Sequence, residues 1–179
     1  MSRPKRAEVV KVIMSLICRE TACIGESLSS LSETYGAIDF VSPLFKFAYT
    51  DYYADEMGGG LHRRFVAFEK LVAPETLPDI KMGTNALEMD RTDEGRRQIN
   101  IDPGYIAQAH LILATGKGYS HRPYLRDGIY ADLTLMYRSG SFHGLPWTYP
   151  DYGSPEVIAM LNRIRQKYVE QLKSIRNAK

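Results

Sequence analysis

Cysteine is scarce in this chain of 179 residues, which contains only Cys18 and Cys23. Their C-x4-C spacing has no second pair of metal ligands, so the sequence does not predict a tetrahedral zinc site. Two unpaired cysteines in a chain of this size are typical of a reducing compartment. We therefore expect two reduced thiols and a cytoplasmic location.

Long apolar runs are also lacking. No stretch reaches the roughly 18 consecutive apolar residues that a membrane-spanning helix needs. The basic start of the chain is not followed by the apolar segment and small-residue cleavage site of a signal peptide. We therefore expect no membrane partner and no cleaved leader.

Neither sign of charge dominates, because 23 basic residues face 21 acidic ones and the net charge is +2. This balance argues against nucleic acid as a partner. The hydrophobic share of 44% and the charged share of 25% are typical of a globular protein. We expect one domain over residues 1–179, in which the basic residues 1–8 are flexible.

The first half of the chain predicts a strand, a helix and a hairpin. A continuous apolar run over Glu8–Cys18 indicates a buried strand. Apolar residues from Ile24 to Tyr35 recur at helical spacing, and Gly36 is a natural residue after a helix end. Two aromatic-rich segments, 38–53 with a bend at Pro43 and 61–72, are expected to pair around the Gly58–Gly60 turn.

The second half predicts two helices and three strands. Pro74 suits the first turn of a helix whose buried stripe runs from Leu77 to Leu87, and residues 90–97 read as a charged turn. A strand from Ile99 is expected to stop at Pro103-Gly104, and further strands cover 110–115 and 129–138. The last helix begins at the N-cap Ser154. Its apolar stripe contains Val157, Leu161, Ile164, Tyr168, Leu172 and Ile175.

The element order is therefore β-α-β-β-α-β, followed by an extra hairpin and a C-terminal helix. The first six elements have the order of a ferredoxin-like split β-α-β unit. We predict an α+β fold: a single domain with a mainly antiparallel sheet, a ferredoxin-like core and helices on one face.

Several motifs together resemble a known family. They are Tyr49-Thr-Asp-Tyr-Tyr53 with Glu56-Met57-Gly58, Asn100-x-Asp-Pro-Gly-Tyr105, Gly128-Ile-Tyr-Ala131 and Pro146-Trp-Thr-Tyr-Pro-Asp-Tyr152. In this combination the chain resembles, over nearly its whole length, the prokaryotic family known as domain of unknown function 4416. The resemblance implies no established activity and no catalytic residues. Some members of that family carry a GTP-binding label.

Signatures of phosphate binding and of nucleophilic catalysis are missing. The nearest segment to a P-loop, Ala114-Thr-Gly-Lys-Gly118, lacks the upstream glycine and the Ser or Thr after Lys117. It also falls in a predicted hairpin instead of before a helix, so a conventional GTPase is not favoured. No G-x-S-x-G elbow is present. The sequence makes no prediction on whether the protein is an enzyme, and it identifies no cofactor.

Carboxylates suggest a second kind of chemistry. Asn100 and Asp102 share one strand face, and Asp132 lies on the polar side of another strand. If these two strands are neighbours, the oxygens converge and would suit Mg²⁺ or an acid/base pair. The alternative is that Asp102 stabilises a turn with Pro103-Gly104 and that Asp132 faces water. The four histidines lack the spacing of a metal site, and no metal ligand is assigned.

Basic and aromatic residues suggest a third kind of chemistry, the binding of an anion or of an aromatic ring. Lys117, His121 and Arg122 would form a cationic cluster for an anion, or simply a polar hairpin tip. Arg63 and Arg64 lie near aromatic residues that stack rings in many binding sites. The alternative is that Trp147 and its neighbours close the end of the sheet.

Two functional hypotheses follow. The first is a protein that binds a small anionic molecule or a nucleotide, with metal-assisted catalysis as one form of it. Its ligand-binding residues would be Tyr52, Arg63, Arg64, Asn100, Asp102, His121, Arg122, Asp132 and Trp147. The second is a non-catalytic interaction or assembly module, whose sheet edge and aromatic loops contact a protein partner or a second copy of the chain. Convergence of the charged residues in one concave site favours the first, and a flat apolar patch favours the second.

Overall fold

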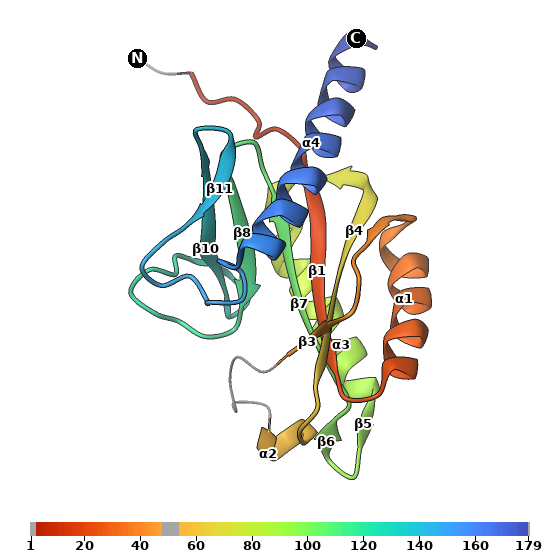
Figure 1. The fold of residues 1–179 in the computed structure, drawn as a ribbon. Coiled ribbons are helices and arrows are strands. Elements are labelled where there is room, and N and C mark those ends of the chain that lie inside the picture. The colour runs from red at the N-terminus through yellow and green to blue at the C-terminus, as the bar shows by residue number, and fades with distance from the viewer. Residues whose placement is uncertain (1–2, 48–53, 179) are drawn as a thin grey trace.

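The computed structural model describes residues 3–47 and 54–178 (Figure 1). Residues 3–8 are exposed and belong to no helix or strand. The helices are α1 (Thr21–Tyr35), α2 (Ala54–Met57), a 3₁₀ turn at Pro74–Thr76, α3 (Leu77–Asp90) and α4 (Pro155–Asn177). The strands are β1 (Val10–Cys18), β2 (Ile38–Val41), β3 (Phe45–Lys46), β4 (His62–Val72), β5 (Thr92–Asp93), β6 (Arg96–Arg97), β7 (Ile99–Ile106), β8 (His110–Thr115), β9 (Tyr124–Arg126), β10 (Ile129–Arg138) and β11 (Ser141–Gly144).

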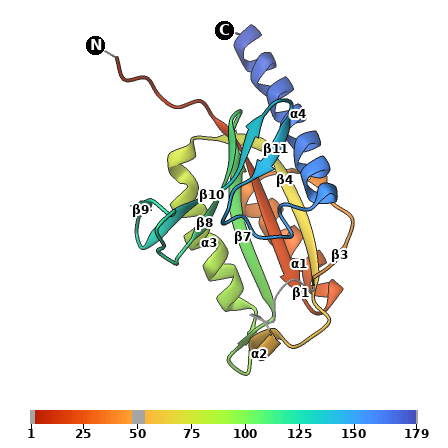
Figure 2. The same ribbon diagram turned by 60° about the vertical axis from the view of Figure 1, so that its left-hand side comes forward.

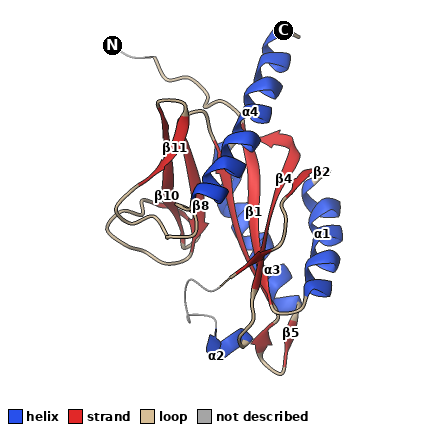
Figure 3. Ribbon diagram, viewed as in Figure 1, coloured by secondary structure: helices blue, strands red, loops and turns tan. Residues whose placement is uncertain are grey.

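One mainly antiparallel sheet dominates the single α+β domain (Figure 3). Its strand order is β11-β10-β8-β7-β1-β4-β2, with β3 paired to β4 and β9 paired to β10. β1 lies in the middle of the sheet and pairs antiparallel with both β4 and β7. Both faces of β1 are covered, which explains why its sequence is a continuous apolar run instead of an alternating one.

The two faces of the sheet carry different helices (Figures 1 and 2). Side chains of α1 and α3, including Leu31 and Ile80, pack on one face against Met14 and Leu16. Side chains of α4 pack on the opposite face against Ile13 and its neighbours. The prediction that the helices share one face is therefore wrong, because α4 covers apolar residues that alternate to the other side of the same strands.

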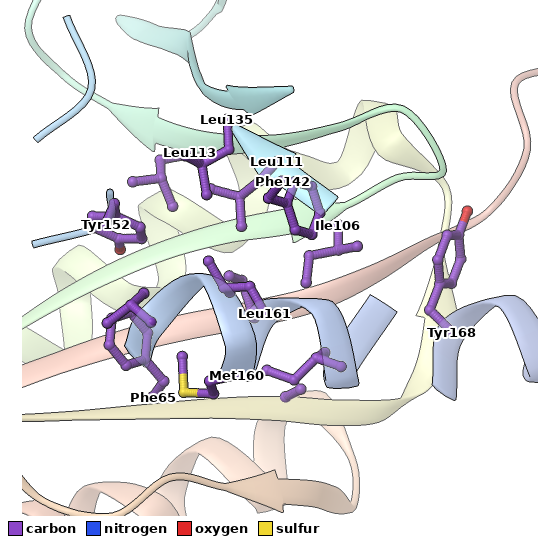
Figure 4. Close-up of a cluster of buried hydrophobic side chains, with 14 of the residues drawn as sticks. Phe65, Ile106, Leu111, Leu113, Leu135, Phe142, Tyr152, Met160, Leu161 and Tyr168 are labelled. Atoms are coloured by element: carbon purple, nitrogen blue, oxygen red, sulfur yellow. The ribbon is translucent and has the colours of Figure 1, made fainter. Parts of the chain in front are cut away.

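The core under α4 extends over the added strands (Figure 4). Met160 and Leu161 of α4 contact an apolar layer from β7, β8, β10 and β11 that includes Leu111, Leu135 and Phe142. The helix starts as predicted, with the Ser154 hydroxyl accepting a hydrogen bond from the Val157 N–H. Ile175 is 42% exposed and lies outside the core, because the last turns of α4 extend beyond the sheet.

The Pro103-Gly104 dipeptide does not end its strand. β7 continues to Ile106, and it pairs with β8 only from Gly104 onward. An added Cβ at Gly104 would lie 2.3 Å from the Ile112 carbonyl oxygen, so glycine here permits close approach of β8. The prediction of a turn at this dipeptide is wrong for that reason. Residues 90–97, predicted as a charged turn, form the small β5–β6 hairpin.

Charged side chains from α3 bond to the β7 backbone before Gly104, where β7 has no β8 neighbour. Glu88 accepts a hydrogen bond from the Ile101 N–H at 2.7 Å, and Lys81 donates to the Ile101 carbonyl at 2.9 Å. Both side chains are buried. Arg97 extends this network by pairing with Glu88 at 2.8 Å and with Glu56 at 2.6 Å. The backbone of β7 is thus satisfied where β8 is absent.

Candidate functional site

The predicted site residues fall into separate groups. Arg63 lies on β4 beneath the start of α4. Asn100 and Asp102 lie on β7, while His121, Arg122, Asp132 and Trp147 gather at the β10 end of the sheet. Arg64 lies on the face opposite Arg63, because successive strand residues point to opposite sides. Tyr52 lies outside the described residues.

Arg63 is the most buried arginine of the described chain, with 6% exposure, and it pairs with the buried carboxylate of Asp151. The loop before α4 brings Asp151 to β4, and Asp151 also accepts a hydrogen bond from the Tyr152 N–H at 2.9 Å. The guanidinium carbon lies 4.4 Å from the centre of the Phe47 ring and 5.3 Å from that of Tyr152. Aromatic rings thus surround a buried ion pair, which strengthens its electrostatic interactions.

Arg63 Nε is buried in this region without a hydrogen-bond partner among the described residues. The Ser15 and Tyr152 hydroxyls are also buried, and they lie close enough that a hydrogen bond from Ser15 lowers the pKa of Tyr152. Ser15 is the neighbour of Phe65 on β4, and the Phe65 ring is 5.6 Å from that of Tyr152. Burial raises the pKa of the Tyr152 hydroxyl above its ordinary range, although the Arg63 charge opposes the shift. Tyr152 therefore stays protonated at physiological pH.

A cavity of about 170 Å³ opens beside Arg63. We call it the Arg63 cavity, and its described lining consists of Phe45, Lys46, Phe47, Arg63, Phe65, Asp151, Ser154, Glu156 and Val157. Two basic and two acidic side chains share this lining with three phenylalanines. The N-terminal end of α4 also borders it, and the helix dipole adds partial positive charge there. The cavity therefore combines both signs of charge with an apolar wall.

Asn100 and Asp102 do share a strand face, as predicted, and Asn100 Nδ2 donates to Asp102 Oδ2 at 2.8 Å. Asp102 is the neighbour of Ser15 across the β1–β7 pair. Its carboxylate lies 3.9 Å from Lys81 Nζ. Asp102 is therefore held between Lys81 of α3 and the β1 position of Ser15.

The condition for convergence with Asp132 is not met, because β8 separates β7 from β10. Over residues 3–47 and 54–178, no group of three or more His, Cys, Asp or Glu side chains is placed to hold a metal ion. Asp102 and Asp132 therefore do not form the joint site for Mg²⁺ or acid/base chemistry that was conditional on neighbouring strands.

The second cluster surrounds Asp132, which is buried on β10. Arg122 Nε donates to Asp132 at 2.8 Å, and the other two guanidinium nitrogens donate to the Tyr149 hydroxyl and the Lys117 carbonyl at 3.2 Å each. Desolvation lowers the pKa of Arg122, but these hydrogen bonds outweigh it and the net shift is upward. Arg122 is thus a permanent cation whose nitrogens all bond to the protein itself.

Aromatic rings cover this ion pair. The His121 ring stacks on the Trp147 indole with centroids 4.8 Å apart, and the Tyr119 ring meets His121 edge-on at 5.3 Å. The indole N–H donates to the Leu133 carbonyl at 2.8 Å, which fixes the Trp147 ring. Trp147 is 39% exposed and Tyr119 is 69% exposed. The cluster therefore both closes the sheet end and presents aromatic surface to solvent.

Sequence reasoning did not place Ser15, Lys46, Phe47 or Glu156 in a site. Ser15 interrupts the apolar run of β1, and this was the available signal: a polar residue in a strand that is buried on both faces. Asp151 belongs to the Pro146–Tyr152 motif, but its pairing with Arg63 joins positions 88 residues apart. Such a contact has no local sequence pattern.

Comparison with known proteins identifies the family. The model of the family described as "Domain of unknown function (DUF4416)" matches residues 8–168. The chain belongs to this family. The match covers β1 through most of α4, including the Arg63 cavity and the Asp132 cluster. No curated protein and no solved structure matches the chain. Among the described residues of this DUF4416 protein, no helix is both long enough and apolar enough to cross a membrane.

Proposed function

We propose that this protein binds a small anionic molecule in the Arg63 cavity. The observation that carries the proposal is a buried arginine on a cavity wall whose Nε has no acceptor. The guanidinium belongs to the cavity lining, so its positive charge would attract an anion held there.

The geometry of the guanidinium suits a carboxylate or phosphate. Asp151 accepts from Nη1, and Nε is buried without an acceptor among the described residues. Arginine binds such groups through two parallel hydrogen bonds, which adds orientation to charge attraction. Lys46 and the N-terminal end of α4 contribute positive potential on the same cavity.

The hypothesis that the ligand is a nucleotide has less support than the hypothesis of a smaller anion. A nucleotide base would have to stack on the exposed rings of the Asp132 cluster, and its phosphate would have to bind Arg122. Each of the three nitrogens of Arg122 already donates to a protein acceptor, so only two of its five N–H groups remain for a phosphate. Nucleotides therefore enter the test below as one class of anion.

A thermal-shift series with acetate, inorganic phosphate and GTP tests the proposal. A ligand at about 100 times its Kd stabilises the folded protein by roughly 2.7 kcal/mol. We expect at least one anion to raise the Tm in the wild-type protein. The shift should shrink in Lys46→Ala and persist in Lys173→Ala, which removes another exposed charge, from the far end of α4. Equal shifts in the two variants, or none with any anion, would contradict a site at this cavity.

An assembly module is the second candidate, and the exposed aromatic surface favours it. Tyr119, Trp147 and Tyr149 all present rings to solvent at one end of the sheet. Exposed aromatic groups of this kind are enriched in protein interfaces. If a second copy of the chain docks here, light scattering should give twice the monomer mass for the wild type and the monomer mass for Tyr119→Ser. A monomer at all concentrations would exclude self-assembly through this surface.

We also infer a ferredoxin-like core. The order β7-β1-β4-β2, with antiparallel neighbours throughout, supports this assignment. The positions of α1 and α3 on one face support it as well. In this interpretation β8–β11 and α4 are additions. An experimental structure that superposes on ferredoxin-like domains only over unrelated strands would contradict it.

A further inference from the structure

The acidic side chains of the Arg63 cavity, Asp151 and Glu156, also constrain the charge of the ligand. Glu156 lines the cavity from the first turn of α4, on the same wall as Ser154. Within the described part of the chain, neither Glu156 nor Lys46 belongs to an ion pair. A purely anionic ligand would gain from Lys46 and Arg63 but would be repelled by Glu156.

Asp151 does not remove this repulsion. Its carboxylate is bonded to Arg63 and to the Tyr152 N–H, so it neutralises part of the arginine charge. The described lining therefore carries two positive and two negative side chains, which balance one another. A cavity with separate positive and negative groups is complementary to a ligand that also carries one positive and one negative group.

The remaining wall is apolar. Phe45, Phe65 and Val157 contribute hydrocarbon surface to the cavity, and Phe47 lies under the arginine. An aliphatic group placed against these side chains would be removed from water, which is favourable in proportion to its area. The cavity lining thus combines basic side chains, a carboxylate and an apolar surface at the same place.

We propose that the ligand is a small zwitterion of the α-amino acid class with an aliphatic side chain. Its carboxylate would pair with the Arg63 guanidinium and with Lys46, and its ammonium group would pair with Glu156. Its side chain would pack on the phenylalanines. This inference rests on the proposed function, because it names the class of anion that the Arg63 cavity holds.

Three matched probes separate the parts of this recognition. Leucine carries both charges, 4-methylpentanoate lacks the ammonium group, and 3-methylbutylamine lacks the carboxylate. Titration calorimetry of the full chain should give a Kd for leucine about tenfold lower than for 4-methylpentanoate, a difference of about 1.4 kcal/mol. The amine should show no heat of binding under the same conditions.

Two variants test which residue recognises the ammonium group and which recognises the carboxylate. Glu156→Gln keeps an exposed polar side chain at the helix start, and it should reduce the preference for leucine over 4-methylpentanoate to about twofold or less. Arg63→Lys keeps the charge beside Asp151 but loses the planar donor edge, so it should weaken both carboxylates by about tenfold. A thermal melt of each variant establishes that it is folded before titration.

The outcomes distinguish the two levels of the argument. If 4-methylpentanoate binds as tightly as leucine, and Glu156→Gln changes neither, the zwitterion proposal is overturned while anion binding at the cavity stands. If neither carboxylate binds, both proposals fail. If the amine binds alone, the site prefers cations and both proposals fail as well.

Discussion

Replacing Gly104 with alanine provides the sharpest test of the sheet packing. Gly104 sits where β8 first meets β7, opposite Leu113. An ideal Cβ at this position would lie 2.3 Å from the Ile112 carbonyl oxygen, 2.7 Å from Leu113 Cδ2 and 3.1 Å from Leu113 Cα. Two of these three atoms belong to the backbone, so rotation of a side chain cannot relieve the contact.

The magnitude follows from the cost of overpacking a well-filled interior. Such substitutions cost typically about 1–3 kcal/mol, and a backbone clash in a buried strand belongs at the upper end. For a chain of this size, each kcal/mol lowers the Tm by about 2–4 °C. Gly104→Ala should therefore lose about 3 kcal/mol of unfolding free energy and about 6–12 °C in Tm.

Urea unfolding followed by circular dichroism measures the change. Gly116→Ala is the matched control, because nothing lies within 4 Å of its added Cβ and its backbone is not left-handed. The control should stay within about 0.5 kcal/mol of the wild type, as surface substitutions usually do. A Gly104→Ala protein as stable as the control would refute the close approach of β7 and β8.

Two further predictions concern stability. Gly25 lies inside α1 with nothing within 4 Å of an added Cβ, so Gly25→Ala should raise the unfolding free energy by about 0.5–1 kcal/mol; a loss in the same urea assay would contradict the exposed helical position. Burial raises the pKa of the Cys18 thiol to about 11. The unfolded chain releases this proton near pH 9 while the folded chain retains it, so stability should fall from pH 9 to 11 by roughly 2 kcal/mol. Cys18→Ala should be less stable at pH 8 but should lose less over that interval; equal losses would show that the thiol is not the group involved.

Local patterns predicted most elements of this fold. The run before Cys18, the helical spacing ahead of Gly36 and the Ser154-Pro155 start of α4 each depend on neighbouring residues, and each gave the element that the structure contains. Backbone hydrogen bonds and helix caps act over a few positions, so the sequence records them directly. The family followed in the same way, from motifs spread over the chain and then from the match to residues 8–168.

The errors arose where distant segments meet. Pro103-Gly104 looks like a turn by itself, and only the approach of β8 makes its glycine a packing requirement. The alternation of β10 placed Asp132 on a polar face, but the sheet order put β8 between that strand and Asp102.

The sequence by itself determined the elements, the balance of charge and the polar residues that are available for binding. Only the tertiary structure decided that Arg63 meets Asp151, that Arg64 lies on the other face, and that Glu156 and Lys46 share the same cavity. Secondary structure is set by short-range propensities, whereas a site is set by strand order and by which face each side chain takes. Those two properties emerge only when the whole sheet is assembled around β1.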